Sequence, residues 1–357
     1  MRCASFTSQV RLWSLPAVAY ALRARREGAQ GNDWRPHLQL SDIDWDAWQP
    51  HDVATLMFVI RDNQALLIRK LRGLGAGKIN APGGRTEPGE TLVETAIRET
   101  REEVGVTPLA PRLRGGLRFQ FVDGYRLACH VFSADGCEGE ARPSPEAIPQ
   151  WTPLAQIPYH EMWADDALWL PLMLAGRTPF SGRFVFDGER MGDYALEARD
   201  PALALFAQLD ALAIVHDTHR HTPVFTVEAA KSVRRSGPEH HTKNLFLRNK
   251  KGRMWLVTLP EDRAVDIAAL ARELDAGHLS FASPERLRRH LGVEPGSVTP
   301  LAVMNDVDQA VTLVLDRSLV EGSVAVHPLT NDRTTVLTGS GLVEFVTATG
   351  HPPRLLG

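Results

Sequence analysis

The alternation of apolar and polar positions predicts two successive regions, each built from short strands and helices. In the first region, apolar strands are predicted at residues 54–60 and 64–69, and a second pair at residues 118–122 and 126–132. Each pair is joined by a short turn rich in Asp, Asn or Gly, which is typical of a hairpin. A charged helical pattern lies between the two pairs, so we expect an α+β fold.

The second region follows an alanine-rich helical pattern near residues 195–212, which has Asp200 and Pro201 at its start. We interpret this helix as the connection into a second, mixed α/β domain. Beyond it, the pattern predicts strands at residues 241–248 and 254–258 and helices at residues 265–274 and 284–291.

Length and composition agree with two domains, because 357 residues exceed one ordinary compact domain. We place a disordered extension at residues 1–45, a first domain at 46–198 and a second at 199–357. The chain has 43% hydrophobic residues, a formal charge of −3 and no apolar run near 18 residues. These values predict a soluble globular protein without a membrane partner.

The N-terminal extension and the cysteines indicate the cellular compartment of the protein. An apolar stretch at residues 12–22 contains Pro16 and precedes several arginines, so a weak signal or transit peptide is the alternative to a disordered extension or an upstream start codon. The chain has an odd number of cysteines without metal-ligand spacing, Cys3, Cys129 and Cys137. They indicate a reducing compartment and no disulfide framework, and we expect a cytoplasmic protein.

Residues 84–106 carry the strongest chemical signal in the chain. A glycine turn precedes a helix in which Glu99, Glu102 and Glu103 fall at i, i+3 and i+4, so three carboxylates share one helical face. Such crowding favours a counter-ion, and a hard cation such as Mg²⁺, or Mn²⁺ in its place, also leaves coordination sites for waters and phosphates. A solvated acidic helix is the alternative, but it explains neither Arg98 nor Glu90.

This run resembles the Nudix box, G-x5-E-x7-R-E-U-x-E-E-x-G-U, with Thr100 as the one soft departure at an aliphatic position. The resemblance implies an α/β/α sandwich. It also implies a cation held by Glu99, Glu102 and Glu103, with Glu146 and the Gly83 carbonyl. Within this set, we interpret Glu102 as the general base and Glu103 as the main metal ligand. Arg98 would pair with Glu90 and Glu102 and hold the carboxylates.

Four further segments of residues 50–197 are similar to the oxidised purine nucleoside triphosphate diphosphatases, the MutT-like branch of that family: residues 73–84, Glu146 before Trp151, residues 162–166 and residues 184–188. The resemblance implies that the purine is held by Asn80, Trp163, Asp165 and Asp166. An indole stacks on a purine, an amide reads its edge, and paired carboxyls can share one proton.

Alternatives to this purine site remain open. A buried Trp beside a helix-capping Asp pair would look the same. Leu74 stands where some relatives carry an aromatic base contact, which leaves the preference for 8-oxo-dGTP open. A nucleotide sugar or a dinucleotide is the rival substrate.

Residues 205–355 resemble the bacterial prolyl-tRNA editing family, also called YbaK-like, which hydrolyses alanine mischarged on tRNA(Pro). The matching segments are residues 241–247, 279–283, 292–300, 326–331 and 348–351. The resemblance places Lys243, Asn244 and His327 at a deacylation site. The turn formed by Gly296, Ser297, Val298, Thr299 and Pro300 would offer backbone N–H groups to a carbonyl or phosphate.

The resemblance implies the acceptor end of tRNA(Pro) as a partner, with prolyl-tRNA synthetase as a further one. Between Lys231 and Arg253, eight side chains are basic and one is acidic, which suits RNA, although a solvated hairpin would show the same charge. Five histidines lie nearby without a usual ligand spacing, so we interpret them as polar loop residues: His216, His219, His221, His240 and His241.

Together these patterns predict a bifunctional hydrolase that cleaves purine nucleoside triphosphates and deacylates mischarged tRNA. Three alternatives stay open. The second domain could bind tRNA or a synthetase without catalysing a reaction, one of the two domains could be idle, or the editing domain could remove cysteine or another small residue. No Ser/His/Asp or Cys/His arrangement is present to propose, so deacylation would use an activated water.

Overall fold

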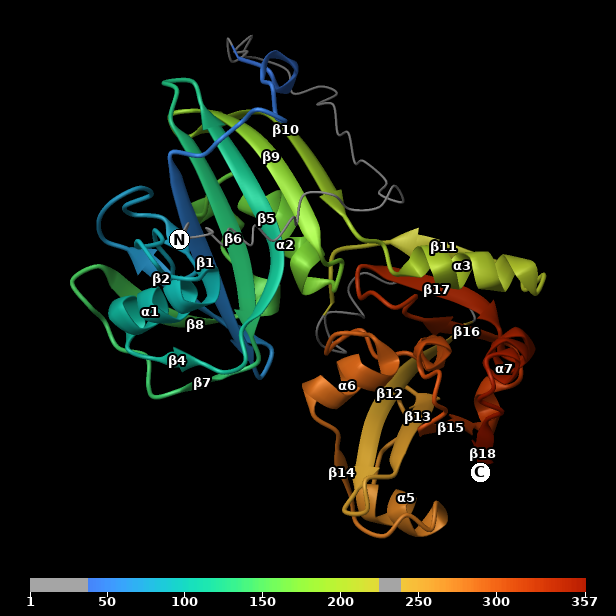
Figure 1. Cartoon of the computed structure of the whole chain (residues 1–357). Coiled ribbons are helices and arrows are strands. Elements are labelled where there is room, and N and C mark those ends of the chain that lie inside the picture. The colour runs from blue at the N-terminus through green and yellow to red at the C-terminus, as the bar shows by residue number, and fades with distance from the viewer. Residues whose placement is uncertain (1–37, 225–238) are drawn as a thin grey trace, which may run out of the picture.

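The computed structural model describes residues 38–224 and 239–357, and it forms two lobes around two eight-stranded sheets (Figure 1). The strands of the first sheet are β1 (Asp52–Arg61), β2 (Gln64–Lys70), β3 (Ile79–Asn80), β5 (Arg112–Phe121), β6 (Arg126–Ala134), β8 (Ala147–Pro153), β9 (Phe180–Asp187) and β10 (Arg190–Ala198). The remaining elements of this lobe are α1 (Leu92–Val104), α2 (Asp166–Leu174), the paired short strands β4 (Thr107–Pro108) and β7 (Cys137–Glu138), and the 3-10 turns η1 (Leu40–Asp42), η2 (Leu154–Gln156) and η3 (Tyr159–Glu161).

The first sheet is mixed, with the order β10-β9-β5-β6-β1-β2-β3 and β8 paired with β2. Both predicted hairpins are confirmed as the antiparallel pairs β1–β2 and β5–β6. The β1–β2 turn places Asp62 and Asn63 at φ 50° and 56°, which these two residue types adopt more readily than most. Parallel pairing of β1 with β6 and of β5 with β9 joins the hairpins into one sheet.

One helix covers each face of this sheet. Met57 packs in the core under α1, whereas its neighbour Phe58 packs on the opposite face with Trp169 of α2. This alternation follows from the pleat, which turns successive side chains to opposite faces. The predicted α/β/α sandwich is therefore confirmed.

The second lobe has the strand order β11-β17-β16-β12-β13-β15-β18, with β14 paired to β12. Its strands are β11 (His216–Arg220), β12 (His240–Asn249), β13 (Met254–Pro260), β14 (Leu279–Phe281), β15 (Val311–Asp316), β16 (Ser323–Val326), β17 (Arg333–Thr338) and β18 (Arg354–Leu356). Its helices are α3 (Ala202–Ala211), α5 (Ile267–Glu273), α6 (Pro284–Leu291) and α7 (Gly339–Ala348), with 3-10 turns η4 (Pro300–Asn305) and η5 (Arg317–Leu319). Buried side chains of α3, α6 and α7 share one core, and those of α5 lie in the other.

Two sequence-based interpretations are wrong at this level. The connecting helix is shorter than its pattern suggested: residues 195–198 pair with β9 as the end of β10, and α3 starts at Ala202, directly after the predicted start at Asp200 and Pro201. Four of the five histidines are not loop residues, because His216 and His219 belong to β11 and His240 and His241 belong to β12.

The described part of the chain begins before the predicted domain start at residue 46. The backbone N–H of Leu40 donates to Asp193 of β10 at 3.0 Å, and the Trp45 indole donates to the carbonyl of Leu40 at 3.1 Å. The greater part of the predicted extension, residues 1–37, lies outside the described residues. Within the ranges 38–224 and 239–357, the structure has no helix both long and apolar enough to cross a membrane.

Candidate active sites

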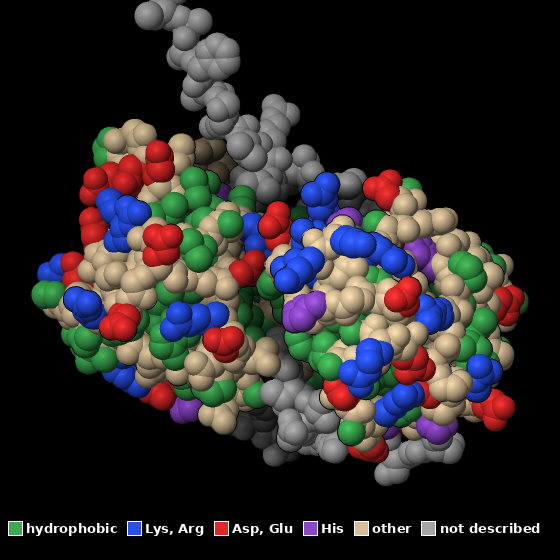
Figure 2. Space-filling model, turned by 90° about the horizontal axis from the view of Figure 1, so that it is seen from below, with side chains coloured by type: hydrophobic (Ala, Val, Ile, Leu, Met, Phe, Trp, Pro, Cys, Tyr) green, Lys and Arg blue, Asp and Glu red, His purple; other side chains and the backbone are tan. Residues whose placement is uncertain are grey.

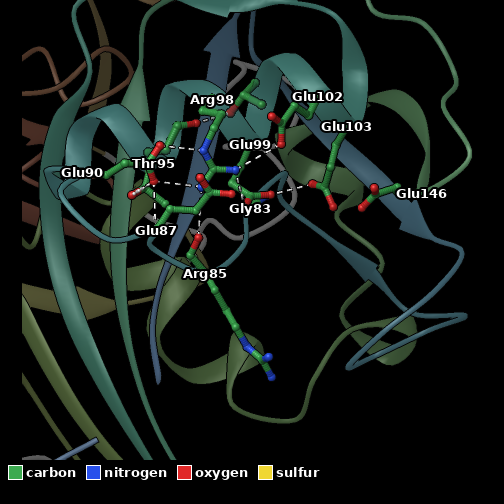
Figure 3. A network of polar contacts seen from close by, with 12 residues as sticks. Gly83, Arg85, Glu87, Glu90, Thr95, Arg98, Glu99, Glu102, Glu103 and Glu146 are labelled. Atoms are coloured by element: carbon green, nitrogen blue, oxygen red, sulfur yellow. Dashed lines mark hydrogen bonds and ion pairs between the residues drawn. The ribbon is translucent and has the colours of Figure 1, made fainter. Parts of the chain in front are cut away.

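Helix α1 presents the predicted carboxylates because its two ends are fixed by local signals. The Thr91 side chain accepts from the backbone N–H of Glu94, and the Glu94 carboxylate accepts from the backbone N–H of Thr91, so the two residues form a capping box. Gly105 ends the helix with φ 77°, a left-handed conformation that glycine adopts without strain. The three glutamates of the box therefore lie on the last two turns of α1 (Figure 3).

Arg98 connects the carboxylates, as Figure 3 shows. Its guanidinium binds Glu90 in a bidentate manner, at 2.6 and 2.9 Å. Its Nη1 also donates to Glu99 at 2.9 Å and to Glu102 at 3.1 Å. The predicted pairing of Arg98 with Glu90 and Glu102 is thus present in the structure, and Glu99 is a further partner.

The three box glutamates differ in exposure, and this separates their possible roles. The exposed fraction of the side chain is 2% for Glu103, 15% for Glu99 and 58% for Glu102. Glu103 accepts from the backbone N–H of Gly83 at 2.9 Å and lies 3.6 Å from the Lys70 ammonium. Burial raises the pKa of Glu103 and of Glu99, and Lys70 and Arg98 only partly oppose that rise.

A divalent cation fits these surroundings, because it would relieve the cost of charging two partly desolvated carboxylates. Glu99, Glu103, Glu146 and Gly83 all line one cavity. Within the described residues, no three His, Cys, Asp or Glu side chains lie close enough to one another to hold a metal as they stand. Arg98 pairs with Glu99, and Arg72 pairs with Glu146, so an incoming cation would compete with these arginines.

The same cavity holds every residue of the predicted purine site. It has a volume of about 530 Å³, and Asn80, Trp163, Asp165 and Asp166 are among its lining residues. The Oδ1 atom of Asn80 accepts from the N–H of Ala81 at 2.8 Å, which leaves the Nδ2 group for a ligand. The candidate base pocket therefore shares one cavity with Glu99, Glu103 and Glu146, whereas Glu102 is not among its lining residues.

Asp165 and Asp166 are both 2% exposed, and each is held by one donor. The Trp169 indole donates to Asp165 at 2.9 Å, and the backbone N–H of Trp163 donates to Asp166 at 3.0 Å. Burial raises the pKa of both carboxyls, and the charge of Asp165 raises that of Asp166 further. A protonated Asp166 would donate a hydrogen bond where an ionised one can only accept.

Trp163 is held on both sides by residues that the sequence analysis did not identify. Phe186 meets it edge-on with ring centroids 5.6 Å apart, and the Lys78 ammonium lies 5.0 Å from the ring centre. Gly75 is required beside it, because a Cβ at that position would lie 2.8 Å from the indole nitrogen.

Further aromatic residues line the cavity from strands and turns distant in sequence: Phe119, Phe121 and Tyr125. The spacing of Phe119 and Phe121 by two residues was the available signal that they share a face of β5.

A second, small cavity of about 50 Å³ lies in the other lobe and contains two of the predicted editing residues, Asn244 and His327. The Asn244 amide accepts from the Thr258 hydroxyl at 2.7 Å and donates to the carbonyl of Val298 at 2.9 Å. Asn244 therefore joins strand β12 to the predicted turn. Three of the five clustered histidines also line this cavity: His219, His221 and His241.

His327 is a buried histidine with a defined orientation. Its Nδ1 lies 2.9 Å from the carbonyl of Arg333, and since a carbonyl only accepts, Nδ1 carries the proton. Burial lowers the pKa of His327, so the neutral ring is favoured and Nε2 keeps its lone pair. The residue can thus accept a hydrogen bond in the cavity.

The structure does not bring Lys243 to the same cavity. Lys243 lies on the face of β12 opposite Asn244, and its ammonium donates to the carbonyl oxygens of Glu261, at 2.8 Å, and Arg263.

The predicted turn is ordered, with Gly296 at φ 87° and buried side chains at Ser297 and Thr299. The N–H of Ser297 already donates to the carbonyl of Glu294 at 2.9 Å, and Pro300 has no N–H, so the turn offers fewer donors than expected. Val298 contacts the site through its carbonyl, which accepts from Asn244.

Within the described residues, the basic stretch between Lys231 and Arg253 does not gather beside this site. Its first members, up to residue 238, lie outside the described residues. Lys250 and Lys251 form the turn at the far end of the β12–β13 hairpin, about 20 Å from Lys243 at the usual rise per residue. On the face drawn in Figure 2, basic and acidic side chains are interspersed over both lobes.

The folds and sites define two classes of hydrolase, one acting on phosphate anhydrides and one on aminoacyl-tRNA. A family model described as the NUDIX domain matches residues 50–173, and one described as the aminoacyl-tRNA editing domain matches residues 221–345. The chain belongs to both families, as an enzyme that fuses a Nudix hydrolase to an aminoacyl-tRNA editing domain.

Named relatives agree with each half. "Oxidized purine nucleoside triphosphate hydrolase" of Danio rerio is 44% identical over 135 residues, which are 38% of this chain and 86% of that protein. "Prolyl-tRNA editing protein ProX" of Acetoanaerobium sticklandii is 38% identical over 154 residues, or 43% of this chain and 94% of that protein. "Prolyl-tRNA synthetase associated domain-containing protein 1" of Danio rerio is 40% identical over 139 residues, which are 38% of this chain and 76% of that protein.

Proposed function

We propose that the first domain hydrolyses oxidised purine nucleoside triphosphates, such as 8-oxo-dGTP, to the monophosphate and pyrophosphate. The observation that supports this proposal is the adjacent buried pair Asp165 and Asp166, which lies with Trp163 in the cavity that Glu99 and Glu103 also line. An acid that keeps its proton beside one that is ionised presents a donor and an acceptor to the edge of a purine. The name of the Danio rerio relative supports the same substrate.

The residues of α1 have separate roles in this proposal. Glu103, Glu99, Glu146 and the Gly83 carbonyl would hold Mg²⁺, or Mn²⁺ in its place, which when bound would neutralise the triphosphate and orient water. Glu102, the most exposed of the three box glutamates, would take the proton from the attacking water. Arg98 would hold Glu99 and Glu102 in place without touching substrate.

The test is release of the nucleoside monophosphate, a product that cleavage of the anhydride yields from every substrate, from 8-oxo-dGTP, dGTP, a nucleotide sugar and a dinucleotide, with and without Mg²⁺; pyrophosphate accompanies it only from the two triphosphates. The proposal expects the largest kcat/KM for the oxidised purine triphosphate and its loss in Glu103→Gln. Arg142→Met, a change at an exposed residue of the same domain, is the matched control. A clear preference for the nucleotide sugar or the dinucleotide would overturn the substrate assignment and leave the hydrolase class intact.

We propose that the second domain deacylates Ala-tRNA(Pro) in the cytoplasm, beside prolyl-tRNA synthetase. Support comes from the ordered pair Asn244 and His327 at one cavity and from the name of the ProX relative. His327 would accept a proton from the attacking water through Nε2. Lys243 would reach the substrate only by leaving the carbonyls of Glu261 and Arg263.

The corresponding test measures amino acid release from alanyl-, cysteinyl- and prolyl-tRNA(Pro) and from alanyl-tRNA(Ala) by the full-length protein. Rapid release of alanine from tRNA(Pro) alone, reduced in His327→Gln, is the expected result. Lys243→Ala, assayed in parallel, decides whether the ammonium takes part. Release from none of the four substrates would refute deacylation and favour a domain that binds tRNA or a synthetase.

A further inference from the structure

A continuous chain of ion pairs crosses from the Nudix domain to the editing domain. Arg114 of β5 donates to Glu294 at 2.7 Å, and Glu294 also accepts from Arg288 of α6 at 2.7 Å. The remaining nitrogens of Arg288 bind Asp135, which follows β6, in a bidentate manner at 2.7 Å. Arg112 of β5 completes the chain with two bonds to Asp135, at 2.8 and 2.9 Å. We name these five residues the ionic clasp.

Three members of the clasp are largely buried, whereas Arg112 and Asp135 are 30% and 33% exposed. The side chains of Arg114, Glu294 and Arg288 are 9%, 17% and 18% exposed. Burial alone would raise the pKa of Glu294, but Arg114 and Arg288 outweigh it and the pKa is lowered, so the carboxylate is charged. Removing one partner from such a cluster leaves an uncompensated buried charge, which is far more disruptive than losing a surface pair.

Glu294 lies directly before the turn that contacts the editing cavity. Its carbonyl accepts from the N–H of Ser297, and the carbonyl of the next residue, Val298, accepts from Asn244. The side chain of Glu294 is thus anchored on the Nudix domain, while its backbone shapes the turn that Asn244 holds. A displacement of Glu294 would be passed to Asn244 through two hydrogen bonds.

A second interdomain contact reaches the other side of the same cavity. Arg177, which follows α2, lies 3.4 Å from Asp200 and 3.5 Å from Asp332, and Asp200 also binds Arg333 at 2.6 Å. All four side chains are at most 12% exposed. The carbonyl of Arg333 is the acceptor that fixes the ring of His327. Nudix residues therefore brace both segments that carry the proposed editing residues.

We propose that the Nudix domain positions the editing site, with Arg114 and Arg177 as positioning residues for a reaction catalysed in the other domain. This inference rests on the proposed deacylation. The editing domain then depends on its neighbour for the arrangement of Asn244 and His327, although all the described residues that line the cavity belong to the editing domain itself.

The experiment uses full-length protein and compares Arg114→Met and Arg177→Met with Arg142→Met, which removes an exposed arginine of the same domain. We expect kcat/KM for Ala-tRNA(Pro) to fall by about tenfold or more in the first two variants and to stay unchanged in the third. Hydrolysis of 8-oxo-dGTP should remain within about twofold in all three, which shows that the Nudix domain is folded. Arg114→Lys keeps the charge and should recover most of the deacylation, a rescue that a purely steric role would not give.

Hydrogen exchange of the backbone amides at residues 297–305 and 333–337 provides a readout that does not need deacylation. Exchange should be about tenfold faster over the first segment in Arg114→Met and over the second in Arg177→Met. If wild-type protein releases no amino acid but exchange changes in this way, the deacylase proposal fails and the bracing stands. Unchanged exchange, or wild-type deacylation in both Met variants, would overturn the positioning proposal.

Discussion

Gly84→Ala should cripple nucleotide hydrolysis while leaving the fold nearly intact. A Cβ at Gly84 would lie 2.3 Å from the carboxyl carbon of Glu99 and 2.4 Å from both of its oxygens, whereas ordinary contacts begin at 3.4 Å. The carboxylate must therefore retreat by about 1 Å, and a displacement of that size at a catalytic group costs about 10²-fold in rate. Glu99 is the far end of a flexible side chain, so the backbone has no need to move.

The assay is pyrophosphate release from 8-oxo-dGTP over a range of Mg²⁺ concentrations, together with thermal unfolding. We expect kcat/KM to fall about 10²-fold, a higher Mg²⁺ requirement, and a melting temperature within a few degrees of wild type. Gly89→Ala is the matched control: Gly89 has φ 91° and nothing within 4 Å of the added Cβ, so it should lose stability without displacing Glu99. Activity of Gly84→Ala within a few-fold of wild type would refute the assigned position of Glu99 as a metal ligand.

Three further predictions follow from the described contacts. In Gly83→Ala, the new Cβ would lie 2.0 Å from the carbonyl oxygen of Thr55. Because the strand backbone cannot move away, we expect a loss of about 1–3 kcal/mol in the free energy of unfolding. An unchanged denaturant midpoint would contradict this expectation. The pKa of Asp166 is raised in the folded state above its ordinary value of 3.8. Above pH 3.8 the unfolded state therefore loses this proton while the folded state keeps it. As a result, Asp166 makes the free energy of unfolding fall as the pH rises. Asp166→Asn should therefore remove this contribution to the pH dependence of the free energy of unfolding above pH 3.8, and an identical pH profile would show that Asp166 is ionised throughout. His327→Gln should slow alanine release from tRNA(Pro) by about 10²-fold and leave 8-oxo-dGTP hydrolysis unchanged. Single-turnover assays of both reactions on one protein preparation measure this difference. A wild-type rate of alanine release would show that His327 takes no part in the reaction.

The parts of the Nudix site that could be predicted are those specified by local sequence. The capping Thr91, the terminal Gly105 and the i, i+3, i+4 spacing of three glutamates are all contained within one helix and its ends. The aromatic residues that line the cavity with Trp163 could not be placed, because Phe121 and Phe186 lie opposite each other only through the register of β9 against β5. Register is set by pairing across the sheet, which a single chain pattern does not specify.

In the editing domain, the opposite orientation of Lys243 and Asn244 had a signal in the sequence. Lys243 and Asn244 are consecutive strand residues, and the pleat turns consecutive side chains to opposite faces. The buried contacts between the domains had no such signal. Arg114 and Glu294 are separated by 180 positions, and the sequence around each predicts only an exposed charged side chain.

The ionic clasp has a consequence for the history and the engineering of this fusion. Because Arg114 and Asp135 come from one half and Glu294 and Arg288 from the other, the two halves can no longer change independently at these positions. A chimaera in which a free-standing editing protein replaced the second half, without its own Glu294 and Arg288, would leave Arg114 unmatched at the junction. Exchange of either half alone therefore has to bring the matching charges with it, or it leaves charged side chains unpaired at the junction.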